Sequence, residues 1–438
     1  MKIYEPLISC DSMVALPNST TNSSTIFGKN SDRPKIESQP LVQVQRKKNH
    51  SEYTECQFVK IPSSTISYAH VGSKPYWCWG YEHGFNEYQV VIGNEGLGTY
   101  IPVSSTPKLI GMEIVRLALE RSKDAKEAVN VMTNLISSHG QGVFENSQNV
   151  RTYDNGFLIA DPKEAYIIET AGHEWVVKQI NDTEGISNIH SIGTNWDDIS
   201  STAISTAESL NLKIDSPKLD FAQTFCDFDS RFDGRGEFRR LRSCTYLDNI
   251  KTKIDLKEMM SLLKDHSDGE NSNASQDFLD TKTICMHYPT PETDGNTAAS
   301  LISELYSDNS QLPIHWTSMY SPCLGIFLPM FIEGEIPKIL SIGNKDYGVN
   351  SPWWMFRQLE KSCRSEGILD NDKASEIRAI WNPIQNEFYE SAILISKEAN
   401  DLKLNGDFKQ MEECLTQYMN NNTNTVLSTL NDLLKVQA

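Results

Sequence analysis

A cysteine near the start of the chain, Cys10, follows Leu-Ile-Ser and precedes an extended apolar run. Three interpretations of its thiol are open. It could be a buried strand residue, which is common for free cysteines. It could be the lipid-modified residue of an exported lipoprotein. It could also be a catalytic nucleophile that becomes the first residue of the chain when the bond between Ser9 and Cys10 is cut.

The residues before Cys10 argue against the lipid anchor. A lipoprotein signal needs an apolar segment of roughly 7–15 residues before its cleavage site. Residues 1–9 contain Lys2, Glu5 and Pro6, so this segment is too short and too polar. No run of about 18 apolar residues occurs elsewhere, and we therefore expect no membrane partner.

Nucleophilic catalysis by cysteine needs a thiolate, a base that generates it and donors that stabilise the oxyanion. Histidine is the usual base, but no cysteine of this chain lies in a papain-like or caspase-like signature. Cleavage before Cys10 would create a different base, because a free α-amino group has a pKa of about 7.7–8.0. Cys10 would then supply the nucleophile and the base together.

The composition limits the partners and cofactors. The chain has 40 Lys and Arg residues against 58 Asp and Glu residues, and the net charge of -18 disfavours nucleic acid as a partner. The nine cysteines are scattered without paired metal-ligand spacings, so we expect reduced thiols in a cytoplasmic protein and no metal bound to them. Cys285 and His287 would share one face of a strand, and we interpret them as packing residues rather than a catalytic pair.

The residues around Cys10 predict a β-hairpin. Residues 11–16 and 25–33 are extended runs, and the turn-rich stretch Pro-Asn-Ser-Thr-Thr-Asn-Ser-Ser separates them. If the two runs pair from the turn outward, the antiparallel register places Cys10 opposite Ser31. The polar residues 29–33 would then flank the thiol.

Hydrophobic periodicity predicts the elements that must position these residues. Further strands are expected at 67–72, 88–93, 156–161, 165–171, 174–180 and 186–193. The last four are typical of an antiparallel meander. Apolar residues at helical spacing between 110 and 135 predict two amphipathic helices, the second ended by Gly140, and another helix pair is expected near 255–266 and 296–306. Together these elements indicate a layered α+β domain.

The chain from about residue 351 onward differs in kind. Apolar residues form one helical stripe over 377–395, with Pro383 as an expected kink, and a second stripe over 426–434. We interpret these helices as packed on the main domain. A dimerisation element is the alternative.

Several segments together carry a resemblance to a known family. They are CDSMVAL, FGKNSDRPKIESQ, YEHGFNEYQVVIGNEGL, HGQG, FLIADPKEAYIIETAGHEW, GISN, ICMHYPTP, HWTSMYSPC and SPWW. Their order and spacing over about residues 8–360 resemble the secernins, which are related to cysteine dipeptidases of the N-terminal nucleophile hydrolase superfamily. The resemblance implies a four-layer αββα sandwich in which the nucleophile begins a central strand, followed by a C-terminal helical extension.

The resemblance also implies a division of the chain. Residues 1–9 would be a propeptide, residues 10–350 the hydrolase domain and residues 351–438 the helical extension. Cys10 matches the N-terminal nucleophile, exposed by autocatalytic cleavage between Ser9 and Cys10.

Further site residues follow from the same resemblance. Asp32 matches the aspartate that anchors the new α-amino group. Lys29 occupies the position at which the hydrolases more often have arginine. The positive charge is kept, but lysine lacks the planar guanidinium that can bind through two parallel hydrogen bonds. Asn86, in Gly-Phe-Asn-Glu, matches the amide donor of the oxyanion hole. Asn188, in Gly-Ile-Ser-Asn, matches a second asparagine that helps to hold intermediates, with Asn195 as the alternative. The same residue types also satisfy turn backbones, which is the plainer interpretation.

The implied function is hydrolysis of a small amide or dipeptide through a thioester at Cys10, without metal or cofactor. A further active-site arginine could be Arg239, Arg240 or Arg242, which the sequence does not separate. Two alternatives keep the fold: an interaction protein without peptidase activity, and an acyltransferase in which an amine replaces water. The C-terminal helices could support a homo-oligomer.

Overall fold

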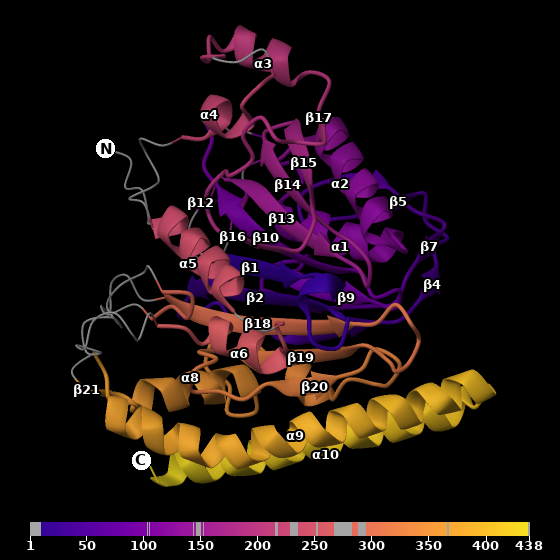
Figure 1. Cartoon of the computed structure of the whole chain (residues 1–438), viewed down its shortest axis with the longest axis vertical. Helices are drawn as coiled ribbons and strands as arrows, with labels where there is room; N and C mark the ends of the chain where they lie inside the picture. The colour runs from indigo at the N-terminus through magenta and orange to yellow at the C-terminus, as the bar shows by residue number, and fades with distance from the viewer. Residues whose placement is uncertain are drawn as a thin grey trace.

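Two antiparallel sheets lie face to face at the centre of this computed structural model (Figure 1). The structure describes residues 10–436 except 103, 105, 143, 146–149, 152, 215–217, 228–234, 251–252, 267–282, 288–294 and 366–367. The predicted propeptide, with Ser9, lies outside the described residues.

The first sheet has six strands, and β1 begins at Cys10. Their spatial order is β16 (Thr183–Ile186), β1 (Cys10–Ala15), β2 (Thr25–Pro34), β18 (Gly295–Leu305), β19 (Ile314–Met319) and β20 (Leu328–Met330). The register of β1 on β2 pairs Cys10 with Ser31, which confirms the predicted hairpin. The helix expected near 296–306 is wrong, because this segment is the central strand β18. All of its residues are buried, so it shows no polar alternation that would mark a strand.

The second sheet has eight strands. Their order is β17 (Asp198–Ile199), β15 (Glu174–Ile180), β14 (Ala165–Ala171), β13 (Asp154–Ala160), β10 (Val91–Leu97), β9 (His83–Asn86), β8 (His70–Ser73) and β3 (Leu41–Val44). The meander of β13, β14 and β15 was predicted correctly. The strand expected over 186–193 is wrong: β16 ends at Ile186 and pairs with β1 in the other sheet.

Short elements complete the chain around these sheets. Four small pairs are β4 (Lys47–Lys48) with β7 (Ile66–Ser67), β5 (Tyr53–Glu55) with β6 (Lys60–Pro62), β11 (Phe144–Glu145) with β12 (Val150–Arg151), and β21 (Arg364–Ser365) with β22 (Ile368–Leu369). The 3-10 turns η1 (Pro17–Ser19) and η2 (Lys338–Ser341) and the short helices α3 (Ala203–Ser209) and α4 (Phe221–Phe225) connect larger elements.

Helices α1 (Gly111–Arg121) and α2 (Ala125–His139) cover the outer face of the eight-stranded sheet. Strand β13 shows how the alternation of side chains divides the two faces. Phe157 and Ile159 pack in the cluster that includes α1 and α2, whereas Leu158 and Ala160 pack in the cluster that includes β1 and β2. Gly140 ends α2 with a positive φ of 64°, as the sequence predicted.

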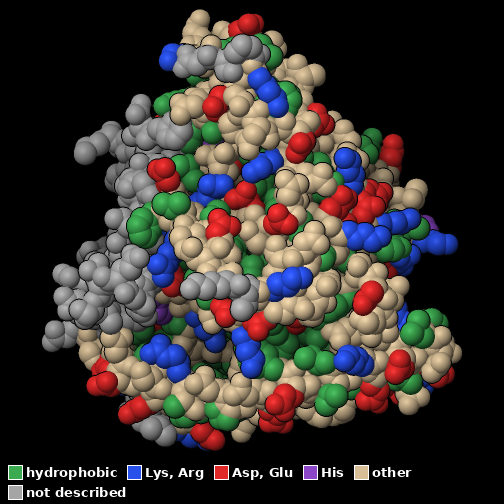
Figure 2. Space-filling view, in the orientation of Figure 1, with side chains coloured by type: hydrophobic (Ala, Val, Ile, Leu, Met, Phe, Trp, Pro, Cys, Tyr) green, Lys and Arg blue, Asp and Glu red, His purple; other side chains and the backbone are tan. Residues whose placement is uncertain are grey.

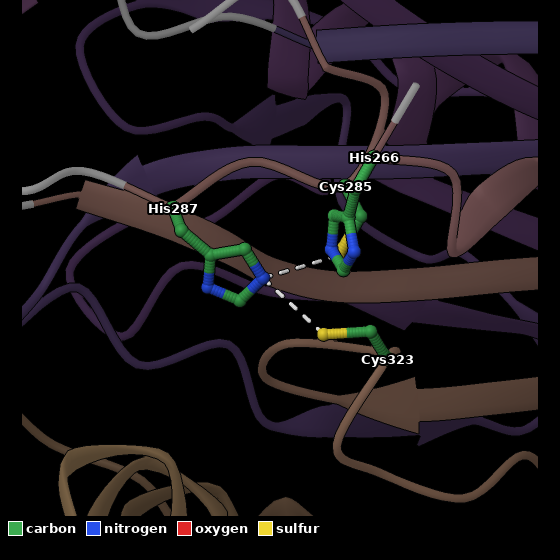
Figure 3. A group of neighbouring side chains, drawn as sticks. All are labelled: His266, Cys285, His287 and Cys323. Carbon is green, nitrogen blue, oxygen red and sulfur yellow. Dashed lines mark hydrogen bonds between the residues drawn. The ribbon is translucent and has the colours of Figure 1, made fainter. Parts of the chain in front are cut away.

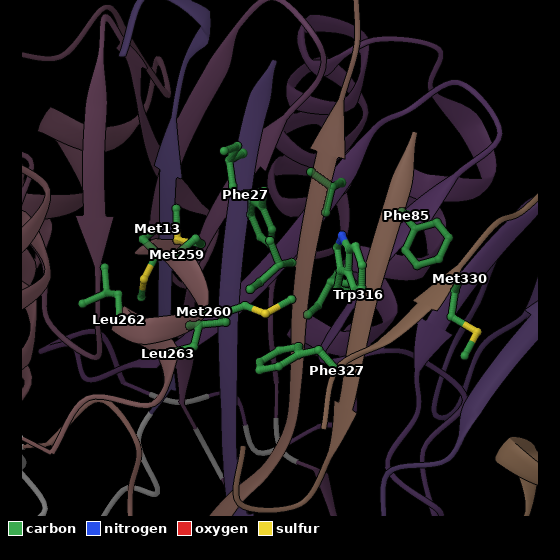
Figure 4. Close-up of a cluster of buried hydrophobic side chains, with 14 of the residues drawn as sticks. Met13, Phe27, Phe85, Met259, Met260, Leu262, Leu263, Trp316, Phe327 and Met330 are labelled. Atoms are coloured by element: carbon green, nitrogen blue, oxygen red, sulfur yellow. The ribbon is translucent and has the colours of Figure 1, made fainter. Parts of the chain in front are cut away.

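The outer face of the six-stranded sheet is covered by α5 (Arg235–Asn249), α6 (Leu256–Leu263) and α8 (Pro352–Ser362). Figure 4 shows Met259, Met260 and Leu263 of α6 beside the strands of this sheet. Gly28 of β2 permits the close approach of α6, because a Cβ there would lie 2.7 Å from Met259 Sδ. With α1 and α2 on the opposite side, the architecture is the α+β, four-layer αββα sandwich that the sequence predicted.

The C-terminal helices α9 (Asn371–Asn405) and α10 (Phe408–Val436) lie side by side along the edge of the molecule below β20 (Figure 1). α9 continues past Pro383. Trp381 is 2% exposed, and its Nε1 donates to the Leu324 carbonyl at 3.0 Å. The interpretation of this region as helices packed on the main domain is confirmed, while the homo-oligomer stays a prediction.

The surface carries no strongly basic face in the view of Figure 2, where acidic and basic side chains are intermixed. Among the described helices, none combines the length and the apolar character that crossing a bilayer requires.

We expect the substitution Trp381→Ala to lower the free energy of unfolding by about 3–5 kcal/mol, since it removes a large side chain from the contact between α9 and the core. The neighbouring Ile380 is 42% exposed, so Ile380→Ala is the matched control and should change stability by less than about 1 kcal/mol. Urea unfolding measures both. A loss in Trp381→Ala that is as small as the loss in Ile380→Ala would show that the Trp381 contact does not stabilise the protein.

Candidate active site

Cys10 is buried, with 3% of its surface exposed, at the first position of β1. Its backbone N–H donates to Asn188 Oδ1 at 2.7 Å. The Asn188 side chain is fixed at its other end, where Nδ2 donates to the Gly96 carbonyl at 2.8 Å. Asn195, the alternative from the sequence, is exposed. Asn188 is therefore the asparagine that the fold brings to the backbone of Cys10.

An arginine of α5 joins the same network. Arg239 is 1% exposed, and its Nη2 donates to Asn188 Oδ1 at 3.0 Å and to Ser187 Oγ at 2.9 Å. Its Nε forms an ion pair of 3.0 Å with the buried carboxylate of Asp11. Burial raises the pKa of Asp11 and the Arg239 guanidinium opposes that rise. Arg239 thus binds both Asp11, the residue that follows Cys10, and Asn188, which accepts from the Cys10 backbone.

The other two arginines of this segment point elsewhere. Arg240 pairs with Glu184 at 2.9 Å, and Arg242 pairs with Asp265 at 2.8 Å. Both are partly exposed. Of the three candidates from the sequence, only Arg239 contacts Asn188 in the described structure.

Lys29 is fully buried between the two sheets. Its Nζ donates to the Asn94 carbonyl at 2.7 Å and to Glu95 Oε1 at 3.1 Å. Glu95 also accepts a hydrogen bond from Ser12 Oγ, so the ion pair is connected to β1. Gly93 makes room for the lysine, because a Cβ there would lie 2.4 Å from Lys29 Cδ. The single ammonium serves backbone and carboxylate acceptors together, which suits its three donors.

The electrostatics around Cys10 favour the thiol over the thiolate. Burial raises the pKa of Cys10 to about 12; the charge of Lys29 lowers it, and the carboxylates of Glu82, Asp32 and Glu95 raise it further. In the described chain the thiol is therefore protonated at neutral pH. Nucleophilic attack from Cys10 would need a base nearby.

Asp32 lies one residue beyond the Cys10–Ser31 pair on β2. Its carboxylate accepts a hydrogen bond of 2.6 Å from Thr297 Oγ1. Thr297 pairs with Asp32 across the sheet, where β18 has an irregularity between Thr297 and Ala299. The fold therefore brings Asp32 close enough for its charge to act on Cys10, and Thr297 fixes its side chain.

Asn86 does not lie with these residues, and its expected role in an oxyanion hole needs correction. Its Nδ2 donates to the carbonyls of Leu119 and Ser122 at 2.9 and 2.8 Å. Its Oδ1 accepts from the backbone N–H groups of Tyr88 and Val90 at 2.9 and 3.1 Å. The side chain faces α1 because the preceding Phe85 fills the space between the sheets. Asn86 stabilises a turn, which is the plainer interpretation.

Sequence reasoning missed two carboxylates of this site, Asp11 and Glu95. Each is a charged residue inside an otherwise buried strand, in the segments Cys-Asp-Ser and Gly-Asn-Glu-Gly. A carboxylate at such a position must be paired, so a search for its cation could have found both.

A separate group of side chains could hold a metal ion, contrary to the expectation of no metal site. The His/Cys cluster consists of His266, Cys285, His287 and Cys323. Its atoms come from distant segments, and only the Cys285–His287 spacing is visible in the sequence.

Comparison with known proteins gives a match to the model of peptidase family C69 over residues 9–235. Among solved structures, the chain is similar to a mutant of conjugated bile acid hydrolase from Clostridium perfringens, at 14% identity and a TM-score of 0.40, covering 71% of this chain and 89% of that one. It is also similar to penicillin V acylase from Agrobacterium tumefaciens, at 12% identity and a TM-score of 0.43, covering 78% and 93%. A third likeness is to the Caenorhabditis elegans ortholog of N-acylethanolamine-hydrolyzing acid amidase, at 13% identity and 0.34, covering 67% and 92%.

We expect Arg239→Met to lower the free energy of unfolding by about 3–5 kcal/mol, because it leaves the Asp11 carboxylate buried without its cation. The control Arg240→Met removes a partly exposed pair and should cost less than about 1 kcal/mol. The double variant Asp11→Asn with Arg239→Met should recover part of the loss. Urea unfolding at neutral pH measures all three, and a stable Arg239→Met variant would contradict the importance of this pair.

Proposed function

The chain belongs to peptidase family C69, a family of hydrolases, and we propose that it is a cysteine-type N-terminal nucleophile amidohydrolase acting on a small amide or dipeptide. The observation that carries the proposal is the position of Cys10. It begins β1 of the six-stranded sheet, with its backbone nitrogen hydrogen-bonded to Asn188. A nucleophile at that position would have its own α-amino group held by the protein once the preceding peptide bond is cut.

The proposed maturation step cuts the Ser9–Cys10 bond. The Cys10 sulfur attacks the Ser9 carbonyl carbon, the carbon–nitrogen bond breaks, and the Cys10 nitrogen takes the proton that the thiol loses. Water then hydrolyses the resulting thioester, which releases a Ser9 carboxylate and restores the Cys10 thiol. The products are a short peptide and a chain that begins with a free amine.

In the catalytic cycle the free α-amino group of Cys10 acts as the base. The unperturbed pKa of such a group is about 7.7–8.0, so it can accept the thiol proton near neutral pH. The thiolate attacks the scissile carbonyl, the amine product leaves with the proton, and water hydrolyses the thioester. The buried Lys29 ammonium supports the thiolate, since its charge lowers the pKa of Cys10.

The surrounding residues hold the amino group in place. Asn188 Oδ1 accepts a hydrogen bond from the Cys10 nitrogen, and Arg239 and Gly96 fix the orientation of the Asn188 amide. Asp32 supplies a negative charge close to Cys10 and is suited to bind the ammonium form of the new amine. Since the Asn86 amide is engaged in a turn, it supplies no oxyanion donor in this proposal.

We expect the intact mass of the purified protein to correspond to a chain that begins at Cys10. The Cys10→Ala variant should keep residues 1–9 and lose hydrolysis of dipeptides and acyl-amino acids, because both steps use the same sulfur. Cys78→Ala removes another buried thiol and is the matched control. The proposal would be overturned if the wild-type chain were unprocessed and the Cys10→Ala variant kept its hydrolytic activity. A wild-type chain that is processed but hydrolyses none of these substrates would favour an interaction protein.

We expect Asn188→Ala to lower kcat/KM by roughly 100-fold, a typical cost of removing one preorganised polar contact at a reacting group. The Asn188 oxygen favours the protonated amine, so its removal should also lower the pKa of the α-amino group and shift the acidic limb of the pH profile downward. Asn195→Ala, at an exposed asparagine, is the control. An unchanged pH profile in Asn188→Ala would argue that Asn188 has only a structural role.

A further inference from the structure

The His/Cys cluster brings together three segments on the outer side of the six-stranded sheet. His266 follows α6, Cys285 and His287 precede β18, and Cys323 lies in the turn between β19 and β20. Figure 3 shows the four side chains converging. All four are buried, with His266 the most exposed at 4%. Such convergence of two imidazoles and two thiols is not required for packing.

The separations between the donor atoms suit one small ion. His287 Nε2 lies 3.5 Å from Cys285 Sγ and 3.2 Å from Cys323 Sγ. In a tetrahedral zinc site with Zn–S near 2.3 Å and Zn–N near 2.0–2.1 Å, neighbouring donors are roughly 3.3–3.8 Å apart. The four donor atoms all lie within 4.8 Å of one another, so modest side-chain shifts would complete a tetrahedron.

The His287 imidazole has a carboxylate beside the ring nitrogen that faces away from the cluster, as metal-bound histidines commonly do. His287 Nδ1 lies 3.5 Å from Glu360 Oε1 of α8, while Nε2 faces the two sulfurs. Glu360 is itself paired with Arg364. Metal-bound histidines commonly direct their second ring nitrogen to a carboxylate, which fixes the ring and its tautomer. Here that carboxylate is already in place.

Charge balance also favours a metal over bare side chains. A divalent cation with two thiolates and two neutral imidazoles forms a complex of zero net charge, which can be buried at low cost. Tetrahedral donor sets of two sulfurs and two nitrogens select zinc among the common divalent ions. We propose that the His/Cys cluster binds one structural zinc ion.

The ion would connect the segment before β18 to the segment after α6, and the first of these is hydrogen-bonded to the part of the sheet that contains Asp32. The Cys285 N–H donates to the Asp265 carbonyl at 3.0 Å, which ties the two sides of the cluster together. Met286, between the two ligands, exchanges hydrogen bonds with Thr297 through its N–H and its carbonyl. Thr297 Oγ1 in turn donates to Asp32. The zinc site is structural in this proposal and does not depend on the proposed hydrolase activity.

The test is the zinc content of the full chain, purified under reducing conditions without chelator and measured by elemental mass spectrometry. We expect about one ion per chain in the wild type, the stoichiometry of a single structural site. Cys323→Ser should abolish stoichiometric zinc, while Cys226→Ser, at a buried cysteine outside the cluster, should retain it. Glu360→Gln should bind zinc roughly 10–100-fold more weakly, because the support of His287 is lost.

Two further measurements keep the proposal testable if Cys323→Ser folds poorly. Cobalt chloride added to the chelator-treated wild type should produce thiolate-to-cobalt charge-transfer absorption, and zinc should raise the thermal midpoint of the same sample. A wild type that takes up neither ion after incubation would overturn the proposal. So would zinc retained at the wild-type level in folded Cys323→Ser, or a chain lighter by two hydrogens because Cys285 and Cys323 form a disulfide.

Discussion

Strand β1 has no face open to solvent, so each polar group that it carries must find a partner inside the protein. This constraint organises the surroundings of Cys10. The Cys10 N–H is bound by Asn188, the Asp11 carboxylate by Arg239, and the Ser12 hydroxyl by Glu95. These partners come from the segment after β16, from α5 and from β10. Three consecutive polar groups on a buried strand thus fix the position of helix α5 and of the facing sheet, because both supply their hydrogen-bond partners.

Much of the fold could be predicted because the relevant signals are local. The β1–β2 register follows from one turn and the length of two extended runs, and the end of α2 follows from Gly140. Strand β18 could not be recognised in this way. Both of its faces are buried between other elements, so its sequence lacks the alternation of a half-exposed strand. Its polar residues, at positions 296, 297, 300, 303 and 304, instead recur at the spacing of one helix face, which is why a helix was the natural expectation.

The sequence could nominate single residues of the candidate site, but it could not show where their side chains point. The family resemblance selected Asn86 as a site residue, but only the three-dimensional placement of Phe85 shows that Asn86 faces α1. Likewise, the packing of α5 against β16 decides that Arg239, and not its neighbours, faces Asn188. The His/Cys cluster lay beyond prediction, because His266 and Cys323 approach Cys285 only through tertiary structure.

The distance along the sequence between Cys10 and its partners has a consequence for the order of events in time. Asn188 is 178 positions away from Cys10, and Arg239 lies farther still. The groups that would assist the proposed cleavage therefore assemble only after long-range contacts have formed, which is the slow part of folding in sheet proteins. A newly synthesised chain would keep its first residues until the sandwich had closed. A free amine at Cys10 would then distinguish molecules that completed folding from those that did not.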